Sequence, residues 1–147
     1  MKRLRSFLVM VPLVSIMTVC GTVTSGGAAN KRTQNQMELN EKACAAYKQA
    51  DAEMNKVYRR ILSENSSDRL FVQKMRAAQR AWVIFRDAHL ASIYPAVDKR
   101  GAYGSINPMC QCMELEKITD ERLHVLQQWV TGIEEGDVCG GSIKVKP

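Results

Sequence analysis

Apolar and polar positions along this chain recur at helical spacings of three and four residues, rather than in the strict alternation of strands. The most regular stretch steps by four, three, four and three residues through Phe71, Met75, Ala78, Trp82 and Phe85. This stripe predicts a helix from about Asp68 to Leu90 whose apolar face lies in the core. Trp82 and Phe85 are therefore expected to be core residues.

A second helix is predicted before this stretch. It starts at Thr33, where the sequence Thr-Gln-Asn-Gln fits a capping box. Its apolar face is formed by Cys44, Tyr47, Met54, Tyr58 and Ile61. It ends at Asn65-Ser66-Ser67, where Ser66 or Ser67 caps the following helix. Because this connection is short, the two helices are expected to be antiparallel neighbours.

A third helix is predicted from about Met109 or Met113 to Glu135, with Gly136 ending it. Its apolar face is formed by Leu115, Ile118, Leu126, Trp129 and Ile133. The residues after it are expected to form a tail that frays from Lys144 onward. The fold class is therefore all-α, an antiparallel three-helix bundle with a long loop between helices 2 and 3, stapled by disulfides.

The periodicity stops between Ser92 and Pro108, which predicts a loop of about 17 residues. Loops this long in a compact domain are usually functional or disordered, and tyrosines, charges and glycines give this one the composition of a contact surface. The residues predicted to bind a partner are Tyr94, Asp98, Lys99, Arg100, Tyr103 and Ser105. For Lys99 and Arg100 the plainer alternative is a solvated loop tip.

Residues 1–29 have the pattern of a secretion signal, with a basic start, an apolar run over 7–19 and small residues at the exit. A membrane span needs roughly 18 to 20 apolar residues, which is more than this run supplies. Lipidation of Cys20 is an alternative, disfavoured by the bulky Val19 before it, and it would make the membrane a partner. The mature chain, residues 30–147, is then one small periplasmic domain.

The charge of the chain excludes one class of partner. The formal net charge is +6, and loss of the three basic residues of the signal leaves 18 basic against 15 acidic residues, or +3. A charge this mild, without a dense basic stripe, argues against binding to nucleic acid.

Four cysteines remain in the mature chain: Cys44, Cys110, Cys112 and Cys139. An even count in a small exported domain predicts disulfides rather than the alternative, a soft-metal site at Cys110-Gln111-Cys112. A bond between Cys110 and Cys112 would close a very tight ring. The two other pairings stay open, and both tie the segment around residue 110 to Cys44 and to the tail. A straight third helix would place Cys139 about 30 Å from Cys112, which is too far for a disulfide. Either the third helix is not straight, or the segment around residue 110 is not bonded to Cys139.

Asp51 places a carboxylate on the apolar face of the first helix. A buried carboxylate needs a charged or hydrogen-bonding partner, and Arg86 and Gln79 are the candidates. We expect a structural polar network of Asp51, Asn55, Gln79, Arg86, Asp87 and Arg122.

The chain carries no hydrolase serine motif, phosphate-binding glycine loop or zinc spacing. No catalytic residue, metal or cofactor is therefore assigned. An enzyme would require Asp51 or Asp87 to line an open cleft.

The motifs of the chain resemble those of the lysozyme-inhibitor LprI-like family of small exported proteins. The matching segments are Cys44-Ala45, Ala50-Asp51, Met54-Asn55, Tyr58, Gln79-Arg80-Ala81-Trp82, Arg86-Asp87, Gly104-Ser105-Ile106, Pro108-Met109, Thr119, Arg122 and Leu126. The resemblance implies an all-helical, disulfide-stapled envelope protein and, for one branch, inhibition of lysozyme. The family commonly has a cysteine shortly after the Arg-Asp pair, where this chain has His89 and Leu90, so disulfide connectivity is not carried over.

These observations predict a periplasmic protein that blocks a peptidoglycan-cleaving enzyme, such as a lysozyme or an amidase, by occluding its active site. The target is a host-type lysozyme or a hydrolase delivered by a rival bacterium, and in the second case the chain is an immunity protein. The mild positive charge favours the second target, because it gives no steering toward a basic lysozyme. The alternative is a non-catalytic structural or assembly protein of the envelope.

Overall fold

The computed structural model describes residues 26–146, which form helices and one isolated parallel bridge between Ile133 and Val145. The helices in this range are α1 (Gly26–Glu64), α2 (Arg69–Ile93), α3 (Lys99–Tyr103) and α4 (Asn107–Thr131). The predicted all-α class is confirmed. Most of the predicted signal segment, including Cys20, lies outside the described residues.

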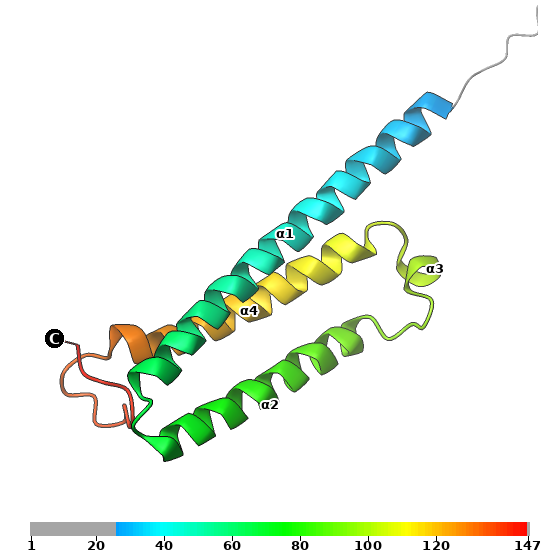
Figure 1. Ribbon diagram of the computed structural model, residues 1–147. Helices are drawn as coiled ribbons and strands as arrows, with labels where there is room; N and C mark the ends of the chain where they lie inside the picture. Colours follow the sequence, from blue (N-terminus) through cyan, green and yellow to red (C-terminus); the bar gives the residue numbers. More distant parts are fainter. Residues whose placement is uncertain (1–25, 147) are drawn as a thin grey trace, which may run out of the picture.

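Figure 1 shows how the long helices are arranged. α1 and α4 lie side by side and make the most extensive contact between helices in the described range. α2 follows α1 after a short turn, runs back along the pair, and leads through α3 into α4. The N-terminal part of α1 extends beyond the start of α4. The packing is therefore uneven, with α2 joined to the other two long helices through a smaller contact.

The core lies where all three long helices contribute side chains. Met54 and Ile61 of α1, Met75 of α2 and Leu126 of α4 are buried together. The partly buried side chains packed around them are Val57, Tyr58, Leu62, Phe71, Trp82, Leu123, Trp129 and Val130. Burial of these apolar groups is the main term that stabilises the domain.

Phe85 is not a core residue, and this prediction was wrong. Its side chain is 56% exposed, and its ring contacts that of His89 with centroids 5.7 Å apart. The buried residues of α2 are Met75 and Gln79. The face of α2 that points into the core is therefore rotated about the helix axis, toward Gln79 and away from Phe85. Trp82 lies on the edge of this face, against the core.

The start of two helices differs from the sequence-based expectation. α1 is already helical from Gly26, so Thr33 lies inside the helix and does not begin it, and no proline between the two positions breaks the helix. The N-cap of α2 is Asp68 rather than either serine before it. Its Oδ1 accepts a hydrogen bond from the backbone N–H of Phe71 at 2.9 Å.

The last long helix also ends elsewhere than predicted. α4 starts at Asn107 and stops at Gly132, four residues before the expected Gly136. Gly132 has a φ of 79°, a conformation that favours glycine. The tail then folds back instead of fraying: Ile133 N–H donates to the carbonyl of Lys144 at 2.9 Å, and Lys146 N–H donates to the carbonyl of Ile133 at 2.8 Å.

Candidate functional site

The connection between α2 and α4, which holds all six residues predicted to bind a partner, is not an open loop. It contains α3, a single helical turn. Asp98 caps α3, because its Oδ1 accepts from the N–H of Gly101 at 2.9 Å. Asp98 therefore has a structural role within the connection.

Three more of the six residues bind one another or the connection itself. The rings of Tyr94 and Tyr103 meet edge to face with centroids 5.4 Å apart. The hydroxyl of Tyr103 accepts from the N–H of Ala96 at 3.2 Å, and Lys99 Nζ donates to the carbonyl of Tyr94 at 2.5 Å. Desolvation, with the nearby Cys110 thiol second, raises the pKa of Tyr94. Tyr103 is therefore not a projecting anchor.

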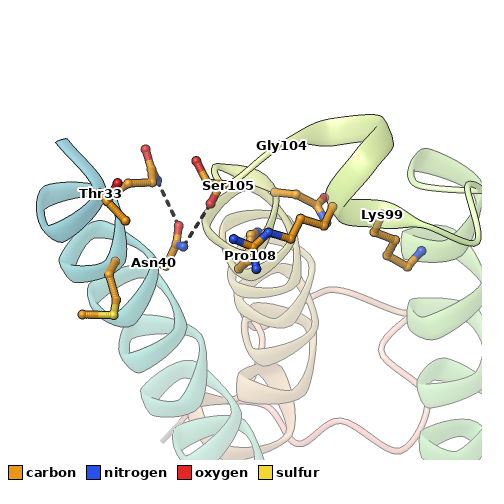
Figure 2. A pocket seen from close by; sticks show the side chains of 10 residues that line it. Thr33, Asn40, Lys99, Gly104, Ser105 and Pro108 are labelled. Atoms are coloured by element: carbon orange, nitrogen blue, oxygen red, sulfur yellow. Dashed lines mark hydrogen bonds between the residues drawn. The ribbon is translucent and has the colours of Figure 1, made fainter. Parts of the chain in front are cut away.

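The remaining two, Arg100 and Ser105, are exposed and line a groove of about 410 Å³ (Figure 2). The groove lies between the N-terminal part of α1, α3 and the start of α4. Its lining residues are Thr33, Gln36, Met37, Asn40, Lys99, Arg100, Gly104, Ser105, Asn107 and Pro108. It joins segments more than 60 residues apart in the sequence.

Two linked hydrogen bonds, both drawn in Figure 2, lead from α1 to the opposite wall of this groove, and the second of them crosses it. Gln36 Nε2 donates to Asn40 Oδ1 at 2.9 Å, and Asn40 Nδ2 donates to the carbonyl of Ser105 at 3.1 Å. The periodicity of α1 gave no reason to assign either amide to a site, because the pairing depends on which segment lies opposite.

The groove offers unused polar groups to a ligand. Asn107 is buried in its wall, and its Oδ1 has no hydrogen-bond partner in the described part of the chain. Arg100 is exposed and forms no ion pair with any residue of that part. Met37 and Pro108 add apolar wall. Arg100 suits a carboxylate of a partner, the free Asn107 oxygen suits an N–H or O–H donor, and the apolar wall suits apolar side chains.

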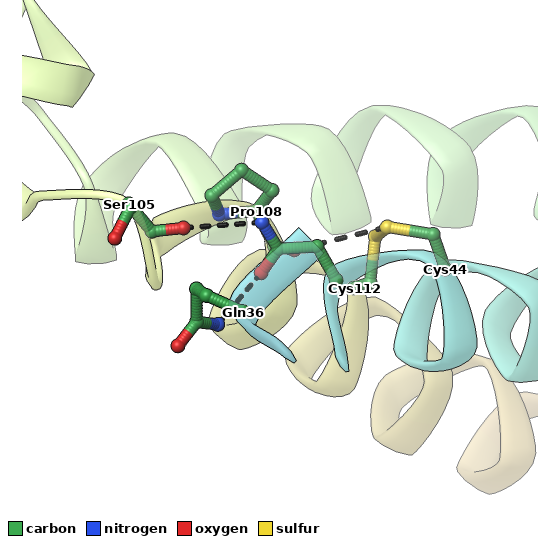
Figure 3. The surroundings of a disulfide bond; sticks show 6 residues. Gln36, Cys44, Ser105, Pro108 and Cys112 are labelled. Atoms are coloured by element: carbon green, nitrogen blue, oxygen red, sulfur yellow. Dashed lines mark hydrogen bonds between the residues drawn. A yellow bond between two sulfur atoms is a disulfide. The ribbon is translucent and has the colours of Figure 1, made fainter. Parts of the chain in front are cut away.

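A disulfide between Cys44 and Cys112 joins α1 to α4 close to this groove (Figure 3). The Cα atoms are 4.9 Å apart, and the bond connects residues 68 apart in the sequence. The predicted staple between helices is therefore confirmed for this pair.

Cys110 and Cys139 form no disulfide within residues 26–146, so the predicted disulfide to the tail was wrong. α4 remains helical up to Thr131, so about 30 Å of helix separates Cys110 from the start of the tail. The tail is held by backbone hydrogen bonds and by Trp129, whose Nε1 donates to Ser142 Oγ at 3.1 Å.

Arg86 lies at the centre of one polar cluster between α2 and α1. Its Nη2 is 2.8 Å from Asp87 Oδ1, and its Nη1 is 3.7 Å from Asp51 Oδ1. Asn55 Nδ2 donates to Asp51 Oδ2 at 2.9 Å, and the guanidinium lies over the Trp82 ring at 5.4 Å. The two carboxylates are thus engaged by Arg86, and nothing in this cluster resembles a pair poised for acid–base chemistry.

The other two predicted network residues form a separate cluster. Arg122 Nε donates to Gln79 Oε1 at 3.1 Å, and Gln79 Nε2 contacts Met54 Sδ at 3.6 Å. Desolvation by burial lowers the pKa of Arg122. The structure therefore divides the six residues of the expected network between two separate clusters, and none of them lines the groove.

Two further features bear on chemistry. Among residues 26–146, no three His, Cys, Asp or Glu side chains converge as a metal site requires. No helix within that range has the length and apolar character needed to cross a membrane.

Residues 26–146 form a small all-helical domain in which the Cys44–Cys112 disulfide joins α1 to α4 beside a groove at one end. Residues 27–126 match the model of the family described as lysozyme inhibitor LprI, so the chain belongs to this family and the resemblance is confirmed. It is also 29% identical over 115 residues to an uncharacterized protein of Rhizobium meliloti (strain 1021), covering 71% of this chain and 80% of that protein. No solved structure matches the chain.

Proposed function

We propose that this protein inhibits a peptidoglycan-cleaving enzyme in the periplasm by occluding its active site. The observation that carries the proposal is the match of residues 27–126 to the lysozyme inhibitor family. The target is a lysozyme or a cell-wall hydrolase secreted by a rival, in which case this chain acts as an immunity protein. The secretion-like pattern of residues 1–29 supports the periplasmic location.

The groove between α1, α3 and α4 is the surface we assign to the target. Glycosidases that cleave peptidoglycan use a pair of carboxylates, and the unpaired guanidinium of Arg100 is the group suited to bind one of them. The Cys44–Cys112 disulfide and the hydrogen bond from Asn40 to Ser105 hold the groove walls in place. A preformed surface loses less conformational entropy on binding. In this proposal the three long helices are an antiparallel scaffold for the groove.

The test uses protein purified from its host with its native N-terminus. Lysozymes and peptidoglycan amidases are assayed by clearing of cell-wall suspensions, and binding is measured by calorimetry. Inhibition of at least one enzyme with one-to-one binding at micromolar concentration or below is expected. Absence of both inhibition and binding across the panel would contradict the proposal.

One observation favours a second candidate, a non-catalytic structural or assembly protein of the envelope. Most of the polar and aromatic side chains in the connection between α2 and α4 contact that connection itself, which suits a structural role. These residues are Tyr94, Asp98, Lys99 and Tyr103. This candidate predicts that deletion of the chain alters envelope integrity in the absence of any hydrolase, and that Arg100→Ala leaves that phenotype unchanged.

A further inference from the structure

The outer face of α2 carries a second apolar stripe, on the side away from the core. Its members step by seven, four, three and four residues: Leu70, Ala77, Ala81, Ile84 and Ala88. All are exposed, with Leu70 at 63% and Ile84 at 70%. Because one helix turn holds 3.6 residues, this stripe lies opposite the buried Met75 and Gln79. Nothing in the described part of the chain covers it.

Cations line both edges of this stripe. Arg69, Arg76 and Arg80 follow one edge at seven- and four-residue steps, and Lys74 lies at the other. The three arginines border a shallow groove of about 340 Å³, together with Ser66, Val72 and Gln73. None of the four cations forms an ion pair or hydrogen bond within residues 26–146.

The only acid of α2 does not neutralise this edge. Asp87 lies in line with the arginines, but its Oδ1 is bound by the guanidinium of Arg86 at 2.8 Å. Asp68, just before the helix, accepts the N–H of Phe71 as its cap. The outer face is therefore cationic over its first half, Arg69 to Arg80, which is about 18 Å of a helix of about 37 Å.

We propose that the outer face of α2 binds an anionic phospholipid surface. The arginines would contact headgroup phosphates, while Leu70 and Ile84 would lie against the boundary of the acyl chains. An exposed helix with an apolar stripe between basic edges is the pattern of in-plane membrane binding. Figure 1 shows α2 as an outer helix, set apart from the pair formed by α1 and α4.

Charge disfavours two other occupants. The same face of a second copy carries the same cations, so two such faces repel each other. A basic enzyme such as a lysozyme is repelled for the same reason. The inference rests on α2 alone and does not depend on the proposed inhibition, because the groove assigned to the target lies between α1, α3 and α4.

The test is co-sedimentation of the protein, purified with its native N-terminus, with vesicles of phosphatidylglycerol and phosphatidylcholine mixed, or of phosphatidylcholine alone. The key variant is Arg76→Gln/Arg80→Gln, and its matched control is Lys56→Gln/Arg59→Gln on α1, which removes the same charge from exposed positions. Each arginine near an anionic membrane contributes about fivefold to partitioning, so the α2 variant should bind roughly thirtyfold more weakly. The control should change binding by less than threefold.

A second pair of variants, one substitution in the stripe and one control, tests the apolar stripe. Ile84→Gln should weaken vesicle binding about fivefold, whereas Met113→Gln on α4, also exposed, should leave it unchanged. Urea unfolding shows that each variant retains its fold. Equal loss in the α2 and α1 charge variants, binding indifferent to phosphatidylglycerol, or no effect of Ile84→Gln would each overturn the proposal. The last result would instead indicate a soluble polyanion or an acidic protein on this face.

Discussion

Arg122 on α4 donates to the side-chain oxygen of Gln79 on α2, with Nε and Oε1 3.1 Å apart. Gln79 is buried and is the polar centre of the inward face of α2. Arg122 is half-buried, and desolvation lowers its pKa. The hydrogen bond therefore offsets the free-energy cost of desolvating the Arg122 guanidinium. It does so where α2 meets α4, two helices that make few other contacts.

Replacing Gln79 with leucine should destabilise the domain by about 1 to 3 kcal/mol, since it leaves the Arg122 guanidinium without its partner in a desolvated position. The free energy of unfolding in urea is the measurement. Gln73→Leu, on the exposed side of the same helix, is the control and should change stability by about 0.5 kcal/mol or less. Equal effects of the two substitutions would mean that the hydrogen bond contributes nothing.

Removing the disulfide with Cys44→Ser/Cys112→Ser should cost about 2 to 4 kcal/mol, because the bond closes a long loop of the unfolded chain. Urea unfolding measures the loss, and a reductant should lower the stability of the unsubstituted protein by a similar amount. Cys110→Ser and Cys139→Ser are the controls, since both thiols are unpaired. A large loss in the Cys139 variant would show that the tail is cross-linked after all.

Gly132→Ala should destabilise the folded-back tail more than Gly136→Ala does. Both glycines have positive φ, so both substitutions incur backbone strain of about 1 kcal/mol. Only at Gly132 would the new Cβ meet backbone atoms, with the carbonyl oxygen of Lys144 at 2.9 Å. Trp129 donates a hydrogen bond to Ser142 of the tail, so a change in the fluorescence of Trp129 reports release of the tail. Identical behaviour of the two variants would show that the close approach at Gly132 does not matter.

Arg100→Glu should weaken binding of the target hydrolase at least thirtyfold, if Arg100 pairs with a carboxylate of the target's active site. Arg59→Glu on α1 makes the same charge change at an exposed position outside the groove and should alter affinity by less than about threefold, since distant rim charges act weakly. Calorimetry with the enzyme found in the inhibition panel gives both affinities. An equal loss of affinity in the Arg100→Glu and Arg59→Glu variants would indicate a long-range effect of charge rather than a contact in the groove.

The polar residues show which contacts local patterns can predict. A carboxylate on the apolar face of α1 required a partner on another helix, and Arg86 lies beside Asp51 in the structure. The long connection shows the opposite case. Tyr103 and Lys99 looked like contact residues by composition, yet both bind within the connection, because α3 turns them back onto Tyr94 and Ala96. Composition records which groups are present, and only the path of the backbone decides where they point.

The sequence by itself determined the all-helical class, the three long helical segments and the family, because helical periodicity and motif order depend on neighbours along the chain. Tertiary structure alone decided the pairing of Cys44 with Cys112, the groove between α1 and α4, and the rotation of α2 that buries Gln79 and exposes Phe85. α2 carries apolar residues on two opposite faces, so its periodicity allows more than one inward face. The physical reason for the choice is the contact with Arg122 and Met54, which lie far from Gln79 in the sequence.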